Sequence, residues 1–586
     1  MEVSFACGIL GNMKKQTQRN DVALVLGGSA GQGLQTIESV ISKMFHRTGY
    51  CVFSTSEYMS RVRGGSNSTL IRISTERPKQ ALCDAMDVVF VLDTDAYEYL
   101  APRFGEETIV IADTACEKLP KIERGKVVFV ELQQAAEEAG GKILMNTVAA
   151  GAILALFGID DADFRHDLEK VFAKKGEDVV AQNIEAAKCG RALGERIAKE
   201  AAFSFEISSK KSGEEQLFLD GSRAVALGAV SGGCDFVSSY PMSPSTGVLV
   251  AMADLSQDLR IAVEQVEDEI TAANMAVGAW FAGARALVTT SGGGFALMAE
   301  TMSLAGMTEN PLVIHLAQRP GPATGLPTRT EQGDLNFALF IGHGEFPRAV
   351  LSPGDAEEAF AAAKHAFDMA DKFQVPAIIL TDQYLLDSHW ESRVSVFDVS
   401  EKPQKHFIET DAEYKRYAFT DDGLSPRGIP GFGEGLVRAD SDEHDESGHI
   451  IEDAETRNTM MEKRMHRLEL LREEALSPVY RGPEKPAFLV VGWGSTKGAI
   501  EEALETIGNK HIAHLHIRQI FPLGTEILDR VSRAQKVIVV ENNFVGQAAD
   551  LLEKHAGRKV DFRITKYDGR PFSAESLARE ISEIVE

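Results

Sequence analysis

Two short segments of this chain place hydroxyl, amide and guanidinium groups on loops whose conformations are restricted by proline and glycine. The first is YPMSPST at positions 240–246, and the second is RPGPATGLPTRTE at positions 319–331. Each follows an apolar run typical of a strand. Loops of this composition present side chains to a ligand from a rigid scaffold. The two segments therefore predict a binding site for a polar ligand.

Acidic side chains lie between these two loops in the sequence. Glu267, Asp268 and Glu269 open a predicted helix that continues as AANMAVG at 272–278. Acids in a first helical turn often do no more than complement the helix dipole. A strand predicted at 286–290 then leads to glycines at 292–294, and the next helix is expected to begin near Phe295. A glycine loop at this place can hold an anion or simply permit close packing.

The order of the motifs is more specific than any one of them. YPMSPST, EDEI with its helix, TSGGGFALMAE and HLAQRPGPATGLPTRTEQGDL follow one another between positions 240 and 335. This order resembles the pyrimidine-binding domain of thiamine diphosphate enzymes and, within them, the alpha chain of the 2-oxoacid:ferredoxin oxidoreductases. The resemblance covers nearly the whole chain beyond Leu217. The last motif is most similar to the 2-oxoglutarate members of that family.

The resemblance implies a catalytic role for Glu269, with Glu267 as the alternative. In thiamine enzymes a glutamate hydrogen-bonds the aminopyrimidine ring nitrogen of the cofactor, an interaction that is stronger where water is excluded. It also implies that Ser243 and Arg319 hold the carboxylate of a 2-oxoacid, because the planar fork of arginine matches two oxygens. Met242 and Ser243 stand where the family usually has isoleucine and threonine, so the hydroxyl is retained.

The same resemblance assigns further residues to the site. For Arg319 itself, the alternative is a surface arginine at the start of a loop. The other residues predicted to contact the substrate are Tyr240, Thr324, Thr328 and Arg329, the last three at the distal carboxylate of 2-oxoglutarate. The residues predicted to contact the cofactor, besides Glu269, are Pro241, Ser291, Gly292 and Gly293.

The sequence offers no clear metal site of its own. Thiamine diphosphate docks through Mg²⁺, usually at a Gly-Asp-Gly run, and none occurs in this chain. The six cysteines have no cluster-ligand spacing and are expected to be reduced thiols. The resemblance therefore implies a beta subunit that supplies the diphosphate and Mg²⁺ site and a [4Fe-4S] cluster. It also implies ferredoxin as electron acceptor, coenzyme A as co-substrate, and a dimer of alpha–beta pairs.

The N-terminal part carries a second match. GGSAGQG at 27–33 and SRVRGGSN at 60–67 resemble the gamma domain of the same enzymes, fused here to the alpha chain. The glycine spacing is not the dinucleotide fingerprint, so NAD binding is not expected. Gly31, Arg61 and Arg63 are candidates for binding the phosphates of coenzyme A. A packing turn or a subunit contact is the alternative.

The pattern of apolar runs predicts an α/β protein of several domains. We expect a gamma-like domain at 21–203, a pyrimidine-binding domain at 215–390, a connector at 391–485, and a transketolase C-terminal-like domain at 486–586. In the last domain, ENNFVGQ at 541–547 matches a family motif and is expected to be structural or interfacial. In the connector, the helix at about 452–474 is expected to have a solvated charged face and a stripe of Met and Leu. The acidic run 440–446 with His444 is interpreted as a solvated loop, with a metal site as the alternative.

Composition limits the function classes. The net charge of −26 over 586 residues disfavours nucleic acid as a partner. No apolar run is long enough for a membrane span, and no secretory signal is expected, so the chain is predicted to be cytoplasmic. The predicted reaction is oxidative decarboxylation of 2-oxoglutarate to succinyl-CoA, or its reverse. Pyruvate, branched-chain or aryl 2-oxoacids are alternative substrates, and a non-catalytic assembly chain is the alternative of another class.

Overall fold

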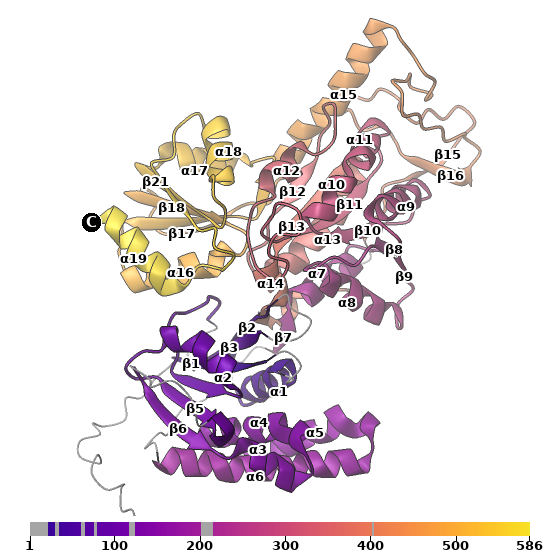
Figure 1. The fold of residues 1–586 in the computed structure, drawn as a ribbon. Coiled ribbons are helices and arrows are strands. Elements are labelled where there is room, and N and C mark those ends of the chain that lie inside the picture. The colour runs from indigo at the N-terminus through magenta and orange to yellow at the C-terminus, as the bar shows by residue number, and fades with distance from the viewer. Residues whose placement is uncertain are drawn as a thin grey trace, which may run out of the picture. The chain divides into compact units, whose positions relative to one another are not determined.

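The computed structural model describes residues 21–29, 34–59, 65–75, 79–116, 124–200, 215–400 and 403–586. The described chain forms two compact units, both of α/β type (Figure 1). The first takes its residues from 21–54, 65–75 and 85–200, and the second from 55–59, 79–84 and 215–586. The three candidate residues for coenzyme A, Gly31, Arg61 and Arg63, lie outside the described residues.

The first unit contains a sheet ordered β6-β5-β4-β1-β3-β2, in which β6, β5, β4 and β1 are parallel and β3 is antiparallel to β1. Its elements are β1 (Asp21–Ser29), α1 (Leu34–Arg47), β2 (Cys51–Glu57), β3 (Ser66–Ser74), β4 (Val88–Val91), α2 (Thr94–Leu100), β5 (Ile109–Asp113), β6 (Lys126–Val130), α3 (Leu132–Ala139), α4 (Met145–Leu156), α5 (Asp161–Phe172) and α6 (Glu177–Glu200). Alternating strands and helices of this kind agree with the α/β class predicted from the sequence.

Small residues bring α4 and α6 into close contact. A Cβ added to Gly190 would lie 2.0 Å from the Val148 carbonyl oxygen, and one added to Gly151 would lie 2.4 Å from that of Ala187. The two helices can therefore approach only because glycine stands at both positions. Among the described residues no single helix has the length and composition to cross a membrane, although the bent pair Leu132–Ala139 and Lys142–Leu156 reaches them together.

The second unit is built on a seven-stranded sheet ordered β20-β12-β13-β11-β10-β8-β9, where β20 is Gln519–Phe521. Helices α7, α8 and α13 pack together on one face, and α9, α10 and α11 on the other, as right-handed crossovers require. The elements of this region are β7 (Gln216–Asp220), α7 (Gly221–Ser231), β8 (Phe236–Ser239), α8 (Thr246–Ser256), β9 (Ala262–Gln265), α9 (Glu269–Phe281), β10 (Ala286–Thr290), α10 (Gly292–Leu297), α11 (Ala299–Met307), β11 (Leu312–Gln318), α12 (Leu335–Phe340), β12 (Ala349–Leu351), α13 (Ala356–Phe373), β13 (Pro376–Asp382), α14 (Gln383–Asp387) and β14 (His389–Arg393).

Four neighbouring parallel strands determine where the sequence motifs meet. Strands β11, β10, β8 and β9 are adjacent and parallel, so their carboxyl ends lie at one edge of the sheet. The Arg319 loop follows β11, the glycines follow β10, YPMSPST follows β8, and the acids of α9 follow β9. Ligands of open α/β sheets bind at this edge. The fold therefore gathers the four motifs in one place.

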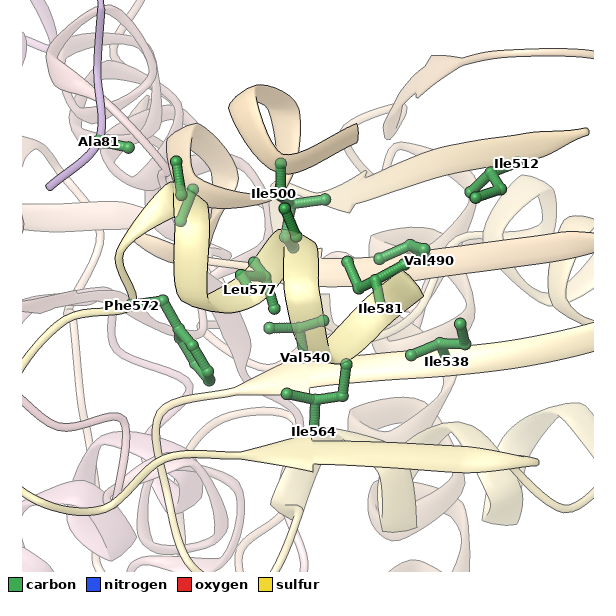
Figure 2. Close-up of a cluster of buried hydrophobic side chains, with 14 residues drawn as sticks. Ala81, Val490, Ile500, Ile512, Ile538, Val540, Ile564, Phe572, Leu577 and Ile581 are labelled. Carbon is green, nitrogen blue, oxygen red and sulfur yellow. The ribbon is translucent and has the colours of Figure 1, made fainter. Parts of the chain in front are cut away.

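The C-terminal part of the second unit has its own sheet, ordered β17-β19-β18-β21-β22. Its elements are β17 (Val479–Arg481), β18 (Phe488–Trp493), α16 (Thr496–Ile507), β19 (Ile512–Ile517), β20 (Gln519–Phe521), α17 (Thr525–Arg533), β21 (Lys536–Glu541), α18 (Gln547–Ala556), β22 (Phe562–Thr565) and α19 (Ala574–Val585). Figure 2 shows its core, where Val490, Val540 and Leu577 pack with Ala81, a residue contributed from far earlier in the chain. Strand β20 leaves this domain and pairs antiparallel with β12 of the central sheet.

The connector is held by a buried carboxylate. It contains β15 (Ile408–Thr410), β16 (Gly428–Gly433) and α15 (Ala454–Glu473). Glu309 is 1% exposed and ion-pairs with Lys463 at 3.0 Å and with Arg467, while the Arg416 guanidinium donates to its carbonyl oxygen at 2.6 Å. Burial alone would raise the pKa of Glu309, but Arg467 and Lys463 hold it well below its usual range. Burial lowers the pKa of Lys463 to about 8; Glu309 opposes this shift, and the nearby Arg467 and Arg416 add to it.

The prediction of a solvated charged face on this helix is therefore wrong in part. Lys463, Arg464 and Arg467 are buried together with Met460 and Leu471, so cations occupy the inward face. They are accepted there because Glu309 and Glu443 neutralise them. In an analysis of sequence periodicity, lysine and arginine are expected to face solvent. The burial of these three cations could therefore not be predicted.

The acidic run 440–446 is also more buried than the solvated loop that was predicted for it. Glu443 ion-pairs with Arg464 and Arg457, and His444 is fully buried against the Tyr417 ring, with centroids 3.9 Å apart. Burial lowers the pKa of His444. In the described part of the chain, no group of three or more His, Cys, Asp or Glu side chains is arranged to hold a metal ion.

Candidate active site

Glu269 is the first residue of α9 and its side chain is buried. Only 4% of it is exposed, and its Oε1 atom has no hydrogen-bond partner. Asp268 caps the helix instead, accepting from the Thr271 backbone N–H at 2.7 Å. Glu267, the alternative from the sequence, is exposed. The capping role thus belongs to Asp268, and Glu269 remains available for a ligand.

The three glycines after β10 lie inside α10 and not in a loop before it. The expected helix start near Phe295 is therefore late, because α10 begins at Gly292. A Cβ at Gly294 would lie 2.4 Å from Glu269 Oε1, and one at Gly292 would lie 2.5 Å from Asp334 Oδ2. Gly293 is exposed, and the nearest atom to its added Cβ is the Met242 sulfur at 4.0 Å. Gly292 and Gly294 make room for two carboxylates, and Gly293 lies next to Met242.

Arg319 directly follows β11 and contacts the YPMSPST loop. Its Nη1 donates to the Ser243 carbonyl oxygen at 2.7 Å, and its Nε is buried without a partner. Burial lowers the pKa of Arg319, and the nearby Asp334 partly offsets this. The Ser243 side chain is exposed, and Tyr240 is 40% exposed. An arginine with an unused buried N–H beside an accessible hydroxyl can receive a carboxylate.

Sequence reasoning did not assign Asp334, which lies in the same site. Its Oδ2 is buried without a partner, and its backbone N–H donates to Gln318 Oε1 at 3.0 Å. Burial raises the pKa of Asp334 to about 6, and Arg319 opposes that rise. The available signal was its place in the QGDL run that ends the last motif.

The ENNFVGQ motif holds the far end of the arginine loop, defined here as residues 319–334. The Gln332 backbone N–H donates to the Asn542 carbonyl at 2.7 Å, and its Oε1 accepts from the Asn542 backbone N–H at 2.9 Å. Gln547 donates to the Gly333 carbonyl at 2.7 Å. Glu541 is buried and accepts from the Ala548 N–H at 2.7 Å, which orders the motif itself. The prediction of a structural role is consistent with these contacts.

The three residues predicted to bind a distal carboxylate have different surroundings and do not share a hydrogen-bond or ion-pair partner among the residues that the structure describes. Thr324 is exposed, in a stretch where Gly325 has a φ of 52°. The Thr328 hydroxyl donates to the Tyr58 carbonyl at 2.7 Å, and Arg329 ion-pairs with Glu57 at 3.5 Å. The structure thus brings Glu57 and Tyr58 to this loop, which the sequence did not suggest.

The residues present fit the aminopyrimidine of thiamine diphosphate. Glu269 Oε1, Ser291 Oγ, Arg319 Nε and Asp334 Oδ2 are all buried without hydrogen-bond partners. Unpaired buried polar atoms are costly, and several at one sheet edge indicate that a polar ligand completes them. Glu269 can pair with a ring nitrogen, and Arg319 with a carboxylate. Pro241, Ser291 and Gly293 line the same edge, next to Met242.

Comparisons with known families agree with this geometry. A family model described as pyruvate flavodoxin/ferredoxin oxidoreductase, thiamine diphosphate-binding, matches residues 227–463. A second, described as pyruvate ferredoxin/flavodoxin oxidoreductase, matches residues 23–193. The chain is thus similar to this group in both units.

Individual relatives cover most of the chain. It is 31% identical to a 2-oxoacid:ferredoxin oxidoreductase subunit alpha of Sulfolobus sp, over 96% of both chains. It is 30% identical to the 2-oxoglutarate synthase subunit KorA of Methanocaldococcus jannaschii, over 62% of this chain and 98% of the relative. It resembles the solved 2-oxoglutarate:ferredoxin oxidoreductase from Magnetococcus marinus with 2-oxoglutarate, coenzyme A and succinyl-CoA bound. That match has a TM-score of 0.90 and 29% identity, and covers 97% of this chain and 100% of the other.

Proposed function

This chain belongs to the 2-oxoacid:ferredoxin oxidoreductases as an alpha subunit, and we propose that its substrate is 2-oxoglutarate. Together with a beta subunit, it converts 2-oxoglutarate, coenzyme A and oxidised ferredoxin to succinyl-CoA, CO₂ and reduced ferredoxin, or runs the reverse carboxylation. The observation that carries the proposal is the buried, unpartnered Glu269 Oε1 at the sheet edge that also holds the unpartnered Arg319 Nε.

The residues of this chain have separable roles. Glu269 pairs with the aminopyrimidine and holds the proton of that contact away from water. When bound, thiamine diphosphate supplies the nucleophilic carbon and the electron sink for decarboxylation. Arg319 and the Ser243 hydroxyl orient the carboxylate next to the ketone. The ENNFVGQ contacts to Gln332 keep the arginine loop in place for that task.

The choice of 2-oxoglutarate rests on the named relatives and on one cation. Among the named relatives is a 2-oxoglutarate synthase subunit, and the solved relative holds 2-oxoglutarate. In the arginine loop, Arg329 is the second guanidinium, 15% exposed at its side chain and paired with Glu57 at 3.5 Å. We propose that it attracts the distal carboxylate of a dicarboxylic substrate, with Thr324 and Thr328 beside it.

The remaining parts of the reaction are assigned to partners. Relatives named as alpha subunits imply at least one further subunit. We propose that a beta subunit binds the diphosphate through Mg²⁺ and carries a [4Fe-4S] cluster that passes electrons to ferredoxin. We further propose that two alpha–beta pairs associate, and that the N-terminal unit takes part in binding coenzyme A.

An anaerobic assay of the complex tests the function. The chain is purified with its beta subunit, and reduction of a viologen dye or ferredoxin is followed with 2-oxoglutarate, pyruvate and indolepyruvate, each with and without coenzyme A. We expect reduction that requires coenzyme A and prefers 2-oxoglutarate. Preference for another 2-oxoacid would contradict the assignment of 2-oxoglutarate as substrate but would still support the proposed type of reaction. An intact complex that contains no thiamine diphosphate after denaturing release would support a non-catalytic assembly chain.

Replacing Arg319 by lysine is expected to weaken binding of every 2-oxoacid. A lysine supplies one donor where the planar guanidinium supplies two, and charge-assisted hydrogen bonds contribute about 1.5–3 kcal/mol. The KM for 2-oxoglutarate should rise roughly 10- to 100-fold, as that energy implies. Arg533→Lys on the exposed face of α17 is the matched control and should leave KM unchanged. Equal KM values for both variants would contradict the assignment.

Replacing Arg329 by methionine is expected to change substrate preference. The substitution removes the cation proposed for the distal carboxylate but keeps an unbranched side chain. The kcat/KM for 2-oxoglutarate should fall about tenfold or more, since one charge-assisted contact is lost. The value for pyruvate, which has no second carboxylate, should stay near wild type. A parallel loss for both substrates would show that Arg329 acts only through its ion pair with Glu57.

A further inference from the structure

A second carboxylate lies near the substrate arginine, because the Asp334 backbone N–H donates to the side chain of Gln318, the residue before Arg319. Neither the sequence motifs nor the relatives' names assign it a role. Asp334 is the last residue of the arginine loop, and the loop returns it to the start of α10 beside Gly292. Its Oδ2 is buried without a partner. Asp334 forms no ion pair with any residue that the structure describes. Arg319 acts on Asp334 through space and donates its own hydrogen bond to Ser243.

We propose that Asp334 is a positioning residue that couples binding of the 2-oxoacid to uptake of one proton. This inference rests on the proposed function, because it requires that Arg319 receive the substrate's carboxylate. An ionised Asp334 competes with the substrate's carboxylate for the Arg319 guanidinium, and it also repels that carboxylate. A protonated Asp334 leaves the guanidinium to the substrate and can donate its own O–H to a neighbouring oxygen.

The surroundings of Asp334 support a proton equilibrium in the physiological range. Burial raises the pKa of this carboxyl to about 6, and Arg319 limits the rise. The other titratable group acting with it is Glu331, whose pKa is raised by its own burial and by Asp334. Binding of an anion next to Asp334 raises its pKa further, so the bound form carries the proton at higher pH than the free form. The substrate's carboxylates, with ordinary pKa values below about 4.5, do not titrate there.

The expected result is a KM that depends on pH. For the wild-type complex, the KM for 2-oxoglutarate should rise with pH above about 6, by up to about tenfold per pH unit, until the pKa of the bound form is reached. In Asp334→Asn the KM should be nearly constant over this range, and kcat should change less than KM. Asp334→Glu, which restores an ionisable group, should restore the slope. Glu331→Gln removes a neighbouring carboxylate from the same loop, and its KM should still rise with pH as in the wild type.

Calorimetry provides a readout that needs no turnover. The complex is titrated with 2-hydroxyglutarate, which carries the same carboxylates without the ketone, in buffers of different ionisation enthalpy near pH 7. Wild type should take up protons on binding and Asp334→Asn should not. Turnover with a flat KM and no proton uptake would overturn this inference and leave the proposed function standing. Proton-coupled binding without turnover of any 2-oxoacid would support the inference and overturn the function. Absence of binding to wild type would overturn both.

Discussion

Glu269→Gln is expected to abolish turnover while the complex still assembles. The amide has the same shape but cannot hold the proton of the contact with the aminopyrimidine. Loss of a positioned acid–base group costs roughly 10²–10⁴-fold in rate. Dye reduction with 2-oxoglutarate measures the loss, and the subunit stoichiometry and bound cofactor are determined on the same preparation. Assembly should persist, because the buried Oε1 atom makes no hydrogen bond within the chain.

The neighbouring acid provides the control for this experiment. Glu267 is exposed two residues earlier, and Glu267→Gln makes the same chemical change outside the buried site. We expect its activity to stay within about twofold of wild type, as for most surface substitutions. If Glu267→Gln were inactive and Glu269→Gln active, the roles of the two residues would be exchanged. If both were active, the site would lie elsewhere.

Glu309→Gln is expected to cause the largest loss of stability in the second unit. The neutral amide would leave Lys463 and Arg467 buried without a counter-charge, and breaking a buried ion pair from one side costs about 3–5 kcal/mol. Glu309 also adopts a left-handed backbone conformation with φ of 49°, which these contacts help to hold. The melting temperature and the rate of limited proteolysis within 403–475 report the effect.

The direction with pH follows from the charge of Glu309. Because its pKa is held well below the usual range in the folded chain, its contribution is present at neutral pH and is lost as the solution is acidified below its ordinary pKa. The difference between wild type and Glu309→Gln should therefore shrink at low pH. Glu469→Gln, on the exposed side of α15, is the control and should change the melting temperature little. Equal melting temperatures for the two variants would show that the connector does not depend on Glu309.

Much of the fold could be predicted because strands in a parallel sheet are continuous apolar runs. The predicted strand at 286–290 coincides with β10. Strand β20 could not be predicted, since its three residues pair with β12 about 170 positions earlier. The buried face of α15 was predicted wrongly in part, because lysine and arginine are expected to face solvent until their partner Glu309 is known.

Candidate site residues could be predicted from the sequence where the residue type itself indicates a chemical role. Glu269 and Arg319 could be predicted as site residues because their motifs resemble a known family; both follow strands at the same edge of the sheet, and each has a buried atom without a partner. Asp334 was not predicted because its raised pKa results from burial, and it is buried only because the folded arginine loop brings it next to α10. The contacts of Thr328 and Arg329 depend on Glu57 and Tyr58, more than 250 positions away in the sequence, which no local pattern can indicate.

The short segments at 55–59 and 79–84 have a consequence for how such a protein can be divided into polypeptides. Gln80 and Ala81 donate backbone N–H groups to Glu502 Oε1 at 2.8 and 3.1 Å, and Ala81 completes the apolar cluster of Figure 2. In one continuous chain these are intramolecular contacts at a high effective concentration. If the chain were cut between α6 and β7, the same contacts would become a binding equilibrium between two polypeptides. Their occupancy would then fall on dilution, and with it the packing around Phe572 and Leu577.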